Sequence, residues 1–140
     1  MRDIDEIVSD FELLDDWEDR YRFLIELGRE LPPMDEADMN ERTKVPGCVS
    51  QVWLTSRTDD GSPPRIRFAG QSDAHIVKGL VAVALSLYSG RTAPEILTLD
   101  AEALFARIGL QDHLTPQRSN GLRSMVRRIQ ADAKAAMEAA

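Results

Sequence analysis

The side chain with the most chemistry in this sequence of 140 residues is its single cysteine, Cys48, which follows Pro46 and Gly47. A lone cysteine makes no internal disulfide and supplies too few thiolates for a zinc or iron-sulfur site. Any role for it therefore uses one thiol, as a nucleophile or as a carrier. The alternative is a buried cysteine that serves as a small apolar side chain. The Pro-Gly turn favours a reactive role, because such turns usually lie at the surface.

Two cations and one histidine are candidate helpers of this thiol. A thiol with a free pKa of about 8.5 is only slightly ionised at neutral pH, and a nearby cation raises the thiolate fraction. Lys44 precedes Cys48 by four residues, and Arg118 is expected in the first turn of a C-terminal helix; each is alternatively a simple surface charge. His75 could shuttle a proton, and Asp73 is a first-turn helix acid. Capping or partner contact is the favoured role for this second pair.

Patterns for cofactor and metal chemistry are absent from the sequence. It contains no Gly-rich phosphate loop, no second cysteine for redox cycling, and no metal-ligand spacing between His75 and His113. None of its lysines lies in a context typical of a cofactor Schiff base. The sequence therefore predicts no bound cofactor and no metal site.

Length and composition indicate one globular domain over residues 1–140. The hydrophobic content of 43% and the charged content of 29% are typical of soluble domains. The formal net charge of -7 disfavours nucleic acid and anionic membranes as partners. The longest apolar run, residues 80–87, is far shorter than the roughly 20 residues that span a bilayer, and we recognise no targeting signal. With a single thiol, these features predict a cytoplasmic protein.

Apolar periodicity and breaker residues predict the elements that must position Cys48. Helices are expected over residues 4–14, from Asp16 to the Pro32-Pro33 pair, from Ser72-Asp73 to Tyr88, from Thr92, from Asp100 to Gly109, and from Thr115-Pro116 to the C-terminal region. The third of these is apolar nearly all round and is expected in the middle of the fold.

Two strands complete the expected architecture. Residues 49–57 and 65–68 have the composition and alternation of strands, and the turn between them predicts an antiparallel hairpin with Cys48 at its first residue. A two-stranded hairpin is marginal alone, so we expect a third strand and a helical cover. The predicted class is α+β, with a small antiparallel sheet of about three strands packed against several helices.

Four sequence blocks, in order along the chain, resemble the SufE family of sulfur-acceptor proteins. They comprise residues 17–32, with WEDRY followed by LG and LP; residues 45–53, VPGCVSQVW; residues 72–80, SDAHIVKGL; and residues 110–122, which include TPQRSNGL. The working cysteine of the family matches Cys48.

The resemblance implies that the protein takes persulfide sulfur from a pyridoxal-phosphate cysteine desulfurase onto Cys48. It would stimulate the desulfurase and pass the sulfur on for iron-sulfur cluster assembly, with a cluster scaffold as the downstream recipient. The pyridoxal phosphate would belong to the partner, and this chain would carry only a transient persulfide. The resemblance also implies a fold similar to the IscU-type scaffold.

These expectations describe an accessory transpersulfidation protein, not a freestanding enzyme, present as a monomer or homodimer. Asp73, His75 and Arg118 are the candidate partner-binding residues, and the loop around Cys48 is expected to be mobile and partly shielded until docking. Two alternatives stay open: an independent thiol enzyme such as a peroxidase or hydrolase, and an adaptor in which Cys48 is incidental.

Overall fold

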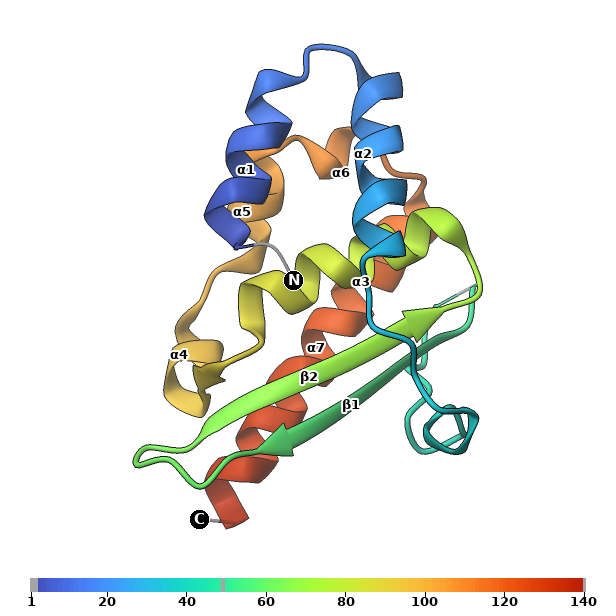
Figure 1. Ribbon diagram of the computed structural model, residues 1–140. Coiled ribbons are helices and arrows are strands. Elements are labelled where there is room, and N and C mark those ends of the chain that lie inside the picture. Colours follow the sequence, from blue (N-terminus) through green and yellow to red (C-terminus); the bar gives the residue numbers. More distant parts are fainter. Residues whose placement is uncertain (1–2, 49, 140) are drawn as a thin grey trace.

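The computed structural model describes residues 3–48 and 50–139 as an α+β domain (Figure 1). The described helices are α1 (Ile4–Leu13), α2 (Trp17–Arg29), α3 (His75–Tyr88), α4 (Ala93–Thr98), α5 (Ala101–Arg107), α6 (Leu110–His113) and α7 (Pro116–Ala139), with a 3-10 turn η1 at Glu36–Asp38. The strands are β1 (Val52–Thr58), β2 (Arg65–Ser72) and β3 (Arg91–Thr92).

The sheet is antiparallel with strand order β1-β2-β3. The β1–β2 hairpin pairs Val52 with Ser72 at one end and Thr58 with Ile66 at the other. The two-residue strand β3 pairs with the beginning of β2. Every second residue of β2 from Ile66 onward is buried, which is the alternation expected of a strand with one covered face. The predicted hairpin and its third strand are therefore confirmed.

Helix α3 is the centre of the fold, as its apolar sequence predicts. Most of its residues are buried, and it packs against α1, α2, α7 and β2 (Figure 1). Two glycines let α2 and α3 approach closely: a Cβ at Gly28 would lie 2.7 Å from Lys78 Cβ, and one at Gly79 would overlap the carbonyl of Leu24. Because neither glycine has a side chain, the two helix backbones can pack in direct contact.

Several predicted helix boundaries coincide with side-chain caps. The carboxylate of Asp16 accepts a hydrogen bond from Glu18 N at 3.0 Å at the start of α2, and Asp100 accepts one from Ala103 N at 3.0 Å at the start of α5. Thr92 and Glu95 form the predicted capping box of α4. These caps satisfy backbone amides that the first helical turn leaves without partners.

Two predicted element starts were wrong, and one short helix was not predicted. The helix expected from Ser72-Asp73 begins at His75, because Ser72 still belongs to β2, where its hydroxyl donates to Gln51 O at 2.7 Å. The strand expected over 49–57 begins at Val52, so Cys48 lies in a loop; Val49 is outside the described residues. The short helix α6 after Gly109 was not predicted.

No helix among the described residues has the length and apolar character needed to cross a membrane.

Candidate functional site

Cys48 lies in a loop whose two ends are tied together by backbone hydrogen bonds. Val45 N donates to Val52 O at 2.8 Å, and Leu54 N donates to Thr43 O at 2.9 Å. An isolated antiparallel bridge joins Lys44 to Trp53 within the same pairing. We call residues 46–51 the Cys48 loop. Its ends are held as firmly as a strand pair, whereas its tip extends beyond that pairing.

A second set of hydrogen bonds attaches the end of the Cys48 loop to the start of α3. Gln51 N donates to the Asp73 carboxylate at 3.0 Å, and Asp73 N donates to Gln51 O at 3.3 Å. The buried Ser72 hydroxyl donates to the same carbonyl at 2.7 Å. Asp73, a predicted partner-binding residue, is thus also a structural anchor of the loop that carries Cys48.

Gly47 directs the loop toward α7. Its φ of 86° lies in the left-handed region, where a residue with a Cβ is strained. A Cβ at this position would also lie 2.6 Å from Ser124 Oγ on α7. The Pro-Gly pair therefore does more than turn the chain, because its glycine lets the loop press against the last helix.

The side chain of Cys48 is half-buried against a small hollow between the loop, α3 and α7. The thiol donates to Gly121 O, with an Sγ–O distance of 3.6 Å. The hollow has a volume of about 30 Å³, which is room for one group of the size of a water molecule. We call it the Cys48 hollow; its other lining residues are Ser50, Val77, Leu80, Gln117, Arg118, Gly121 and Met125.

Burial raises the pKa of the Cys48 thiol above its ordinary value. The hollow has apolar walls at Val77, Leu80 and Met125, and such surroundings disfavour the thiolate. In this closed arrangement burial, and not a nearby cation, sets the direction of the Cys48 pKa shift. Lys44 does not line the hollow, and although Arg118 does, desolvation dominates.

The predicted partner-binding residues occupy three different positions around Cys48. Arg118 lines the hollow itself, Asp73 holds the loop through Gln51, and His75 is exposed at the first residue of α3. His75 does not line the hollow. The structure thus brings Arg118 beside the thiol and places the other two at the junction between β2 and α3.

His113 and Trp17 form a separate contact. Their rings stack with centroids 3.9 Å apart, and the Tyr21 hydroxyl donates to the carbonyl of His113. This contact joins α2 to α6 and gives His113 a structural role. Trp17 is half-buried, packs against the core and stacks on an exposed histidine.

Sequence reasoning missed the residues that build the hollow. Gly121 and Met125 lie four residues apart on α7, and Val77 and Leu80 lie three apart on α3, so each pair shares a helix face. The helical period marks Val77, Leu80 and Met125 as inward, but it does not show that they meet Cys48. Within residues 3–48 and 50–139, no group of three histidine, cysteine or carboxylate side chains could hold a metal ion.

Comparison with known proteins assigns the chain to a family. The family model "SufE: Fe-S metabolism associated domain" matches residues 5–133. An uncharacterized SufE-like protein of Rhizobium meliloti is 52% identical over 140 residues, covering 99% of this chain and 100% of that protein. One of Rhizobium etli is 55% identical over 135 residues, covering 96% and 91%.

A solved structure shares the fold. The solution structure of a hypothetical protein from Thermus thermophilus matches with a TM-score of 0.77 at 21% identity, covering 96% of each chain. The sequence matches extend this likeness from fold to family, and they fit the resemblance that the sequence blocks around Cys48 indicated. The chain belongs to the SufE family, which gives it a role in iron-sulfur metabolism as a sulfur acceptor.

Proposed function

We propose that Cys48 accepts persulfide sulfur from a pyridoxal-phosphate cysteine desulfurase, and that the protein thereby stimulates the desulfurase. The sulfur would then pass to a scaffold on which iron-sulfur clusters are assembled. In this proposal the chain is an accessory protein of the cytoplasm with no resident cofactor, and pyridoxal phosphate belongs to its partner.

The observation that supports this proposal is that the half-buried thiol of Cys48 lies beside a hollow with room for one more atom. A persulfide is a thiol extended by a single sulfur, and a volume of about 30 Å³ is enough for a group of that size. The apolar walls would keep water and small thiols from the outer sulfur. The Gly121 carbonyl, 3.6 Å from Sγ, offers an acceptor at the mouth of this space.

The transfer step is a thiol–persulfide exchange. The Cys48 thiolate attacks the outer sulfur of the desulfurase persulfide and forms a new S–S bond, while the S–S bond of the donor breaks. The electron pair leaves with the desulfurase thiolate, so no external oxidant or reductant is needed. The rate follows the thiolate fraction and the access of the attacking sulfur.

In the half-buried position that the structure shows, Cys48 is suited to hold a persulfide but not to attack the persulfide of a partner. Because burial raises the pKa of the thiol, the half-buried side chain is protonated at neutral pH and weakly nucleophilic. Docking would have to draw the loop away from α7, which both exposes the sulfur and removes the desolvation that holds its proton. The loop can make this movement while its tied ends, at Val45–Val52 and Gln51–Asp73, stay in place.

Asp73, His75 and Arg118 remain the proposed docking residues. Asp73 and His75 are exposed beside the end of the loop, and Arg118 lines the hollow that the thiol would leave. A partner that contacts these groups would touch both sides of the Cys48 loop. If charge reversal at Asp73 leaves activation of the desulfurase unchanged, the docking role is wrong.

The experiment is intact-protein mass spectrometry after incubation with cysteine and a cysteine desulfurase, with Cys48→Ser as the matched variant. We expect a mass gain of one or more sulfur atoms that reductant reverses and that the variant lacks. We also expect the wild-type protein, and not the variant, to accelerate alanine release by the desulfurase.

Other outcomes separate the alternatives. Desulfurases that are active but leave Cys48 unmodified would overturn the proposal. A variant that still stimulates the desulfurase would favour an adaptor in which the thiol is incidental. A freestanding thiol enzyme, such as a peroxidase, would turn over its substrate without any desulfurase.

A further inference from the structure

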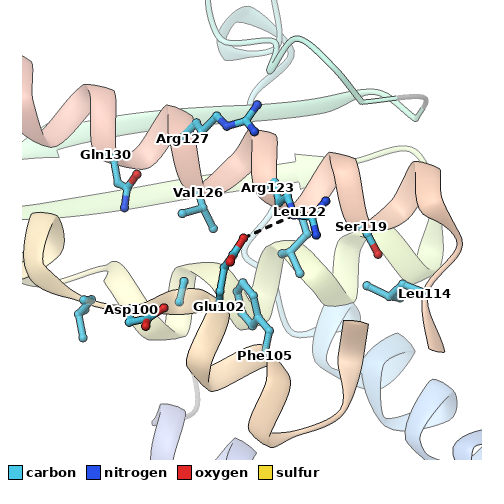
Figure 2. A pocket seen from close by; sticks show the side chains of 12 residues that line it. Asp100, Glu102, Phe105, Leu114, Ser119, Leu122, Arg123, Val126, Arg127 and Gln130 are labelled. Carbon is cyan, nitrogen blue, oxygen red and sulfur yellow. Dashed lines mark ion pairs between the residues drawn. The ribbon is translucent and has the colours of Figure 1, made fainter. Parts of the chain in front are cut away.

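A second and larger concavity lies between α5 and α7 (Figure 2). Its volume is about 310 Å³, at the lower end of the range for small-molecule sites. It shares no lining residue with the Cys48 hollow. We call it the α5–α7 groove. The sulfur-transfer proposal makes no use of it.

The floor of the groove is apolar. Phe105 and Leu122 are each 3% exposed, and Leu114 and Val126 also line the space. Figure 2 shows the Phe105 ring and Leu122 close to the Glu102 carboxylate, on facing helices. A ligand that enters the groove would therefore bury an apolar group of the size of a leucine or phenylalanine side chain.

The rim carries opposite charges on its two walls. Glu102 on α5 and Arg123 on α7 face each other across the groove, with Glu102 Oε1 3.5 Å from Arg123 Nε (Figure 2). Their side chains are 67% and 48% exposed, so the pair is weak and is readily exchanged for other partners. Arg127 adds a second cation to the α7 wall, and Asp100, whose carboxylate caps α5, adds a second acid opposite.

We propose that the α5–α7 groove binds a free α-amino acid with a large apolar side chain. The ammonium group would replace Arg123 as the partner of Glu102, and the carboxylate would replace Glu102 as the partner of Arg123. The side chain would enter the floor formed by Phe105 and Leu122. Opposite charges on facing walls above an apolar floor match the three substituents of such a molecule.

Ligands with one charge fit this arrangement less well. A simple carboxylate would bind Arg123 but would displace Glu102 and leave it without a partner. A simple amine would do the same to Arg123. Only a zwitterion replaces both halves of the existing ion pair, so the exchange leaves no charge unpaired.

The experiment is a titration of the isotope-labelled free protein, followed by the shifts of its backbone amides in NMR spectra. We expect L-leucine to shift amides of α5 and of residues 119–130, with a dissociation constant on the order of 1 mM, because so small a ligand gains little free energy. Three analogues each lack one substituent: 4-methylpentanoate lacks the ammonium, 3-methylbutylamine lacks the carboxylate, and glycine lacks the side chain. Each should bind about tenfold more weakly, since a charge-assisted hydrogen bond or a buried apolar side chain is lost.

Variants at the rim assign each substituent to its wall. Glu102→Gln should weaken leucine binding and strengthen 4-methylpentanoate binding, because Arg123 then has no ion-pair partner to give up. Arg123→Gln should weaken the binding of leucine and of 4-methylpentanoate and strengthen that of 3-methylbutylamine, because Glu102 is then free to pair with the amine. Both side chains are largely exposed, so the variants should fold normally. Lys134→Gln removes an exposed cation of the same helix outside the groove and should change nothing.

Two results would overturn this proposal. If leucine at tens of millimolar causes no shift in the groove, there is no amino-acid site. If 4-methylpentanoate binds as tightly as leucine, the acidic wall contributes nothing and the class of ligand is wrong. Neither result depends on Cys48 or on a desulfurase, so the sulfur-acceptor proposal stands or falls separately.

Discussion

The contact between α2 and α3 and the loop around Cys48 are held in opposite ways. At the first, Gly28 and Gly79 bring two backbones so close that a Cβ at Gly28 would lie 2.8 Å from Gly79 N. At the second, the thiol lies 3.6 Å from Gly121 O beside an open space of about 30 Å³. The helices have no room to shift, whereas the side chain at the loop tip has room for one more atom.

This difference shows where the fold needs rigidity. The α2–α3 contact fixes α3, whose Val77 and Leu80 form one wall of the Cys48 hollow. The described part of the Cys48 loop is held at its ends by backbone pairing through Val45 and Gln51, and at its tip by a long thiol–carbonyl contact with α7. A segment attached in this way can open locally at a free-energy cost well below that of global unfolding. If Cys48 accepts sulfur as proposed, the reacting side chain would thus be the movable part of a rigid frame.

Gly79→Ala should give the largest effect, because the new Cβ would overlap the carbonyl of Leu24 and force the two helices apart. We expect a loss of about 3 kcal/mol in the free energy of unfolding, the upper end of the usual cost of overpacking. Denaturation by urea, followed by circular dichroism, measures it. The matched control is Gly121→Ala, whose Cβ would lie at an ordinary 3.6 Å from Cys48 Sγ.

The control should be neutral or slightly stabilising, because alanine favours a helix over glycine by up to about 1 kcal/mol. If both variants lost the same free energy of unfolding, the α2–α3 contact and the contact between Gly121 and Cys48 would be equally tight, contrary to the difference described above.

A substitution at Tyr88, at the end of α3, tests whether the tightly packed core contains an unsatisfied polar group. Its hydroxyl is fully buried, and among the described residues it has no hydrogen-bond partner. Burial, reinforced by the charge of Asp100, raises the pKa of Tyr88 to about 12. Tyr88→Phe removes an unsatisfied polar group, so we expect the variant to be about 1 kcal/mol more stable at neutral pH.

The pH dependence gives a second readout of the same residue. The unfolded chain loses the phenolic proton near pH 10 and the folded protein near pH 12. Between these values the folded state binds more protons, so the wild type loses stability as the pH rises, by about 3 kcal/mol in total. Tyr88→Phe should lack this loss. Parallel stability curves for the two proteins would show that the phenol pKa is the same in the folded and unfolded states, so that burial does not raise it.

Local sequence patterns were enough to predict the frame. Alternation and turn residues predicted the hairpin, and Thr92 and Asp100 marked helix starts as caps. Ser72 misled the prediction because serine is a common helix cap, whereas here it ends β2 and its hydroxyl donates to the carbonyl of Gln51 in the Cys48 loop. Local propensity could not show this tertiary contact.

The site was less predictable because its parts are distant in the sequence. Cys48 and its hydrogen-bond acceptor Gly121 are 73 residues apart, and no spacing rule joins them. The pKa of the Cys48 thiol could not be predicted, because it depends on the burial of the side chain, which the sequence does not display. Cys48 itself was identifiable from its Pro-Gly context and from the family blocks.

Asp73→Ala addresses the anchor of the Cys48 loop and should change global stability by no more than Tyr88→Phe does. It removes the hydrogen bond from Gln51 N, at a cost of about 1 kcal/mol. The larger consequence should be local: the loop opens more often, so alkylation of Cys48 by iodoacetamide becomes several-fold faster. The pH midpoint of alkylation, which burial sets above that of free cysteine in the wild type, should also fall.

Asp73→Asn is the matched control, because its side-chain oxygen can still accept from Gln51 N although the charge is gone. If the anchor is what matters, the asparagine variant should be alkylated at the wild-type rate and only the alanine variant should be faster. If both variants are alkylated equally fast, the charge and not the hydrogen bond restrains the loop. Desulfurase activation measured on the same two variants then separates the two roles of Asp73. If the carboxylate contacts the desulfurase, both variants should lose activation equally. If Asp73 acts only as the loop anchor, Asp73→Ala alone should change activation.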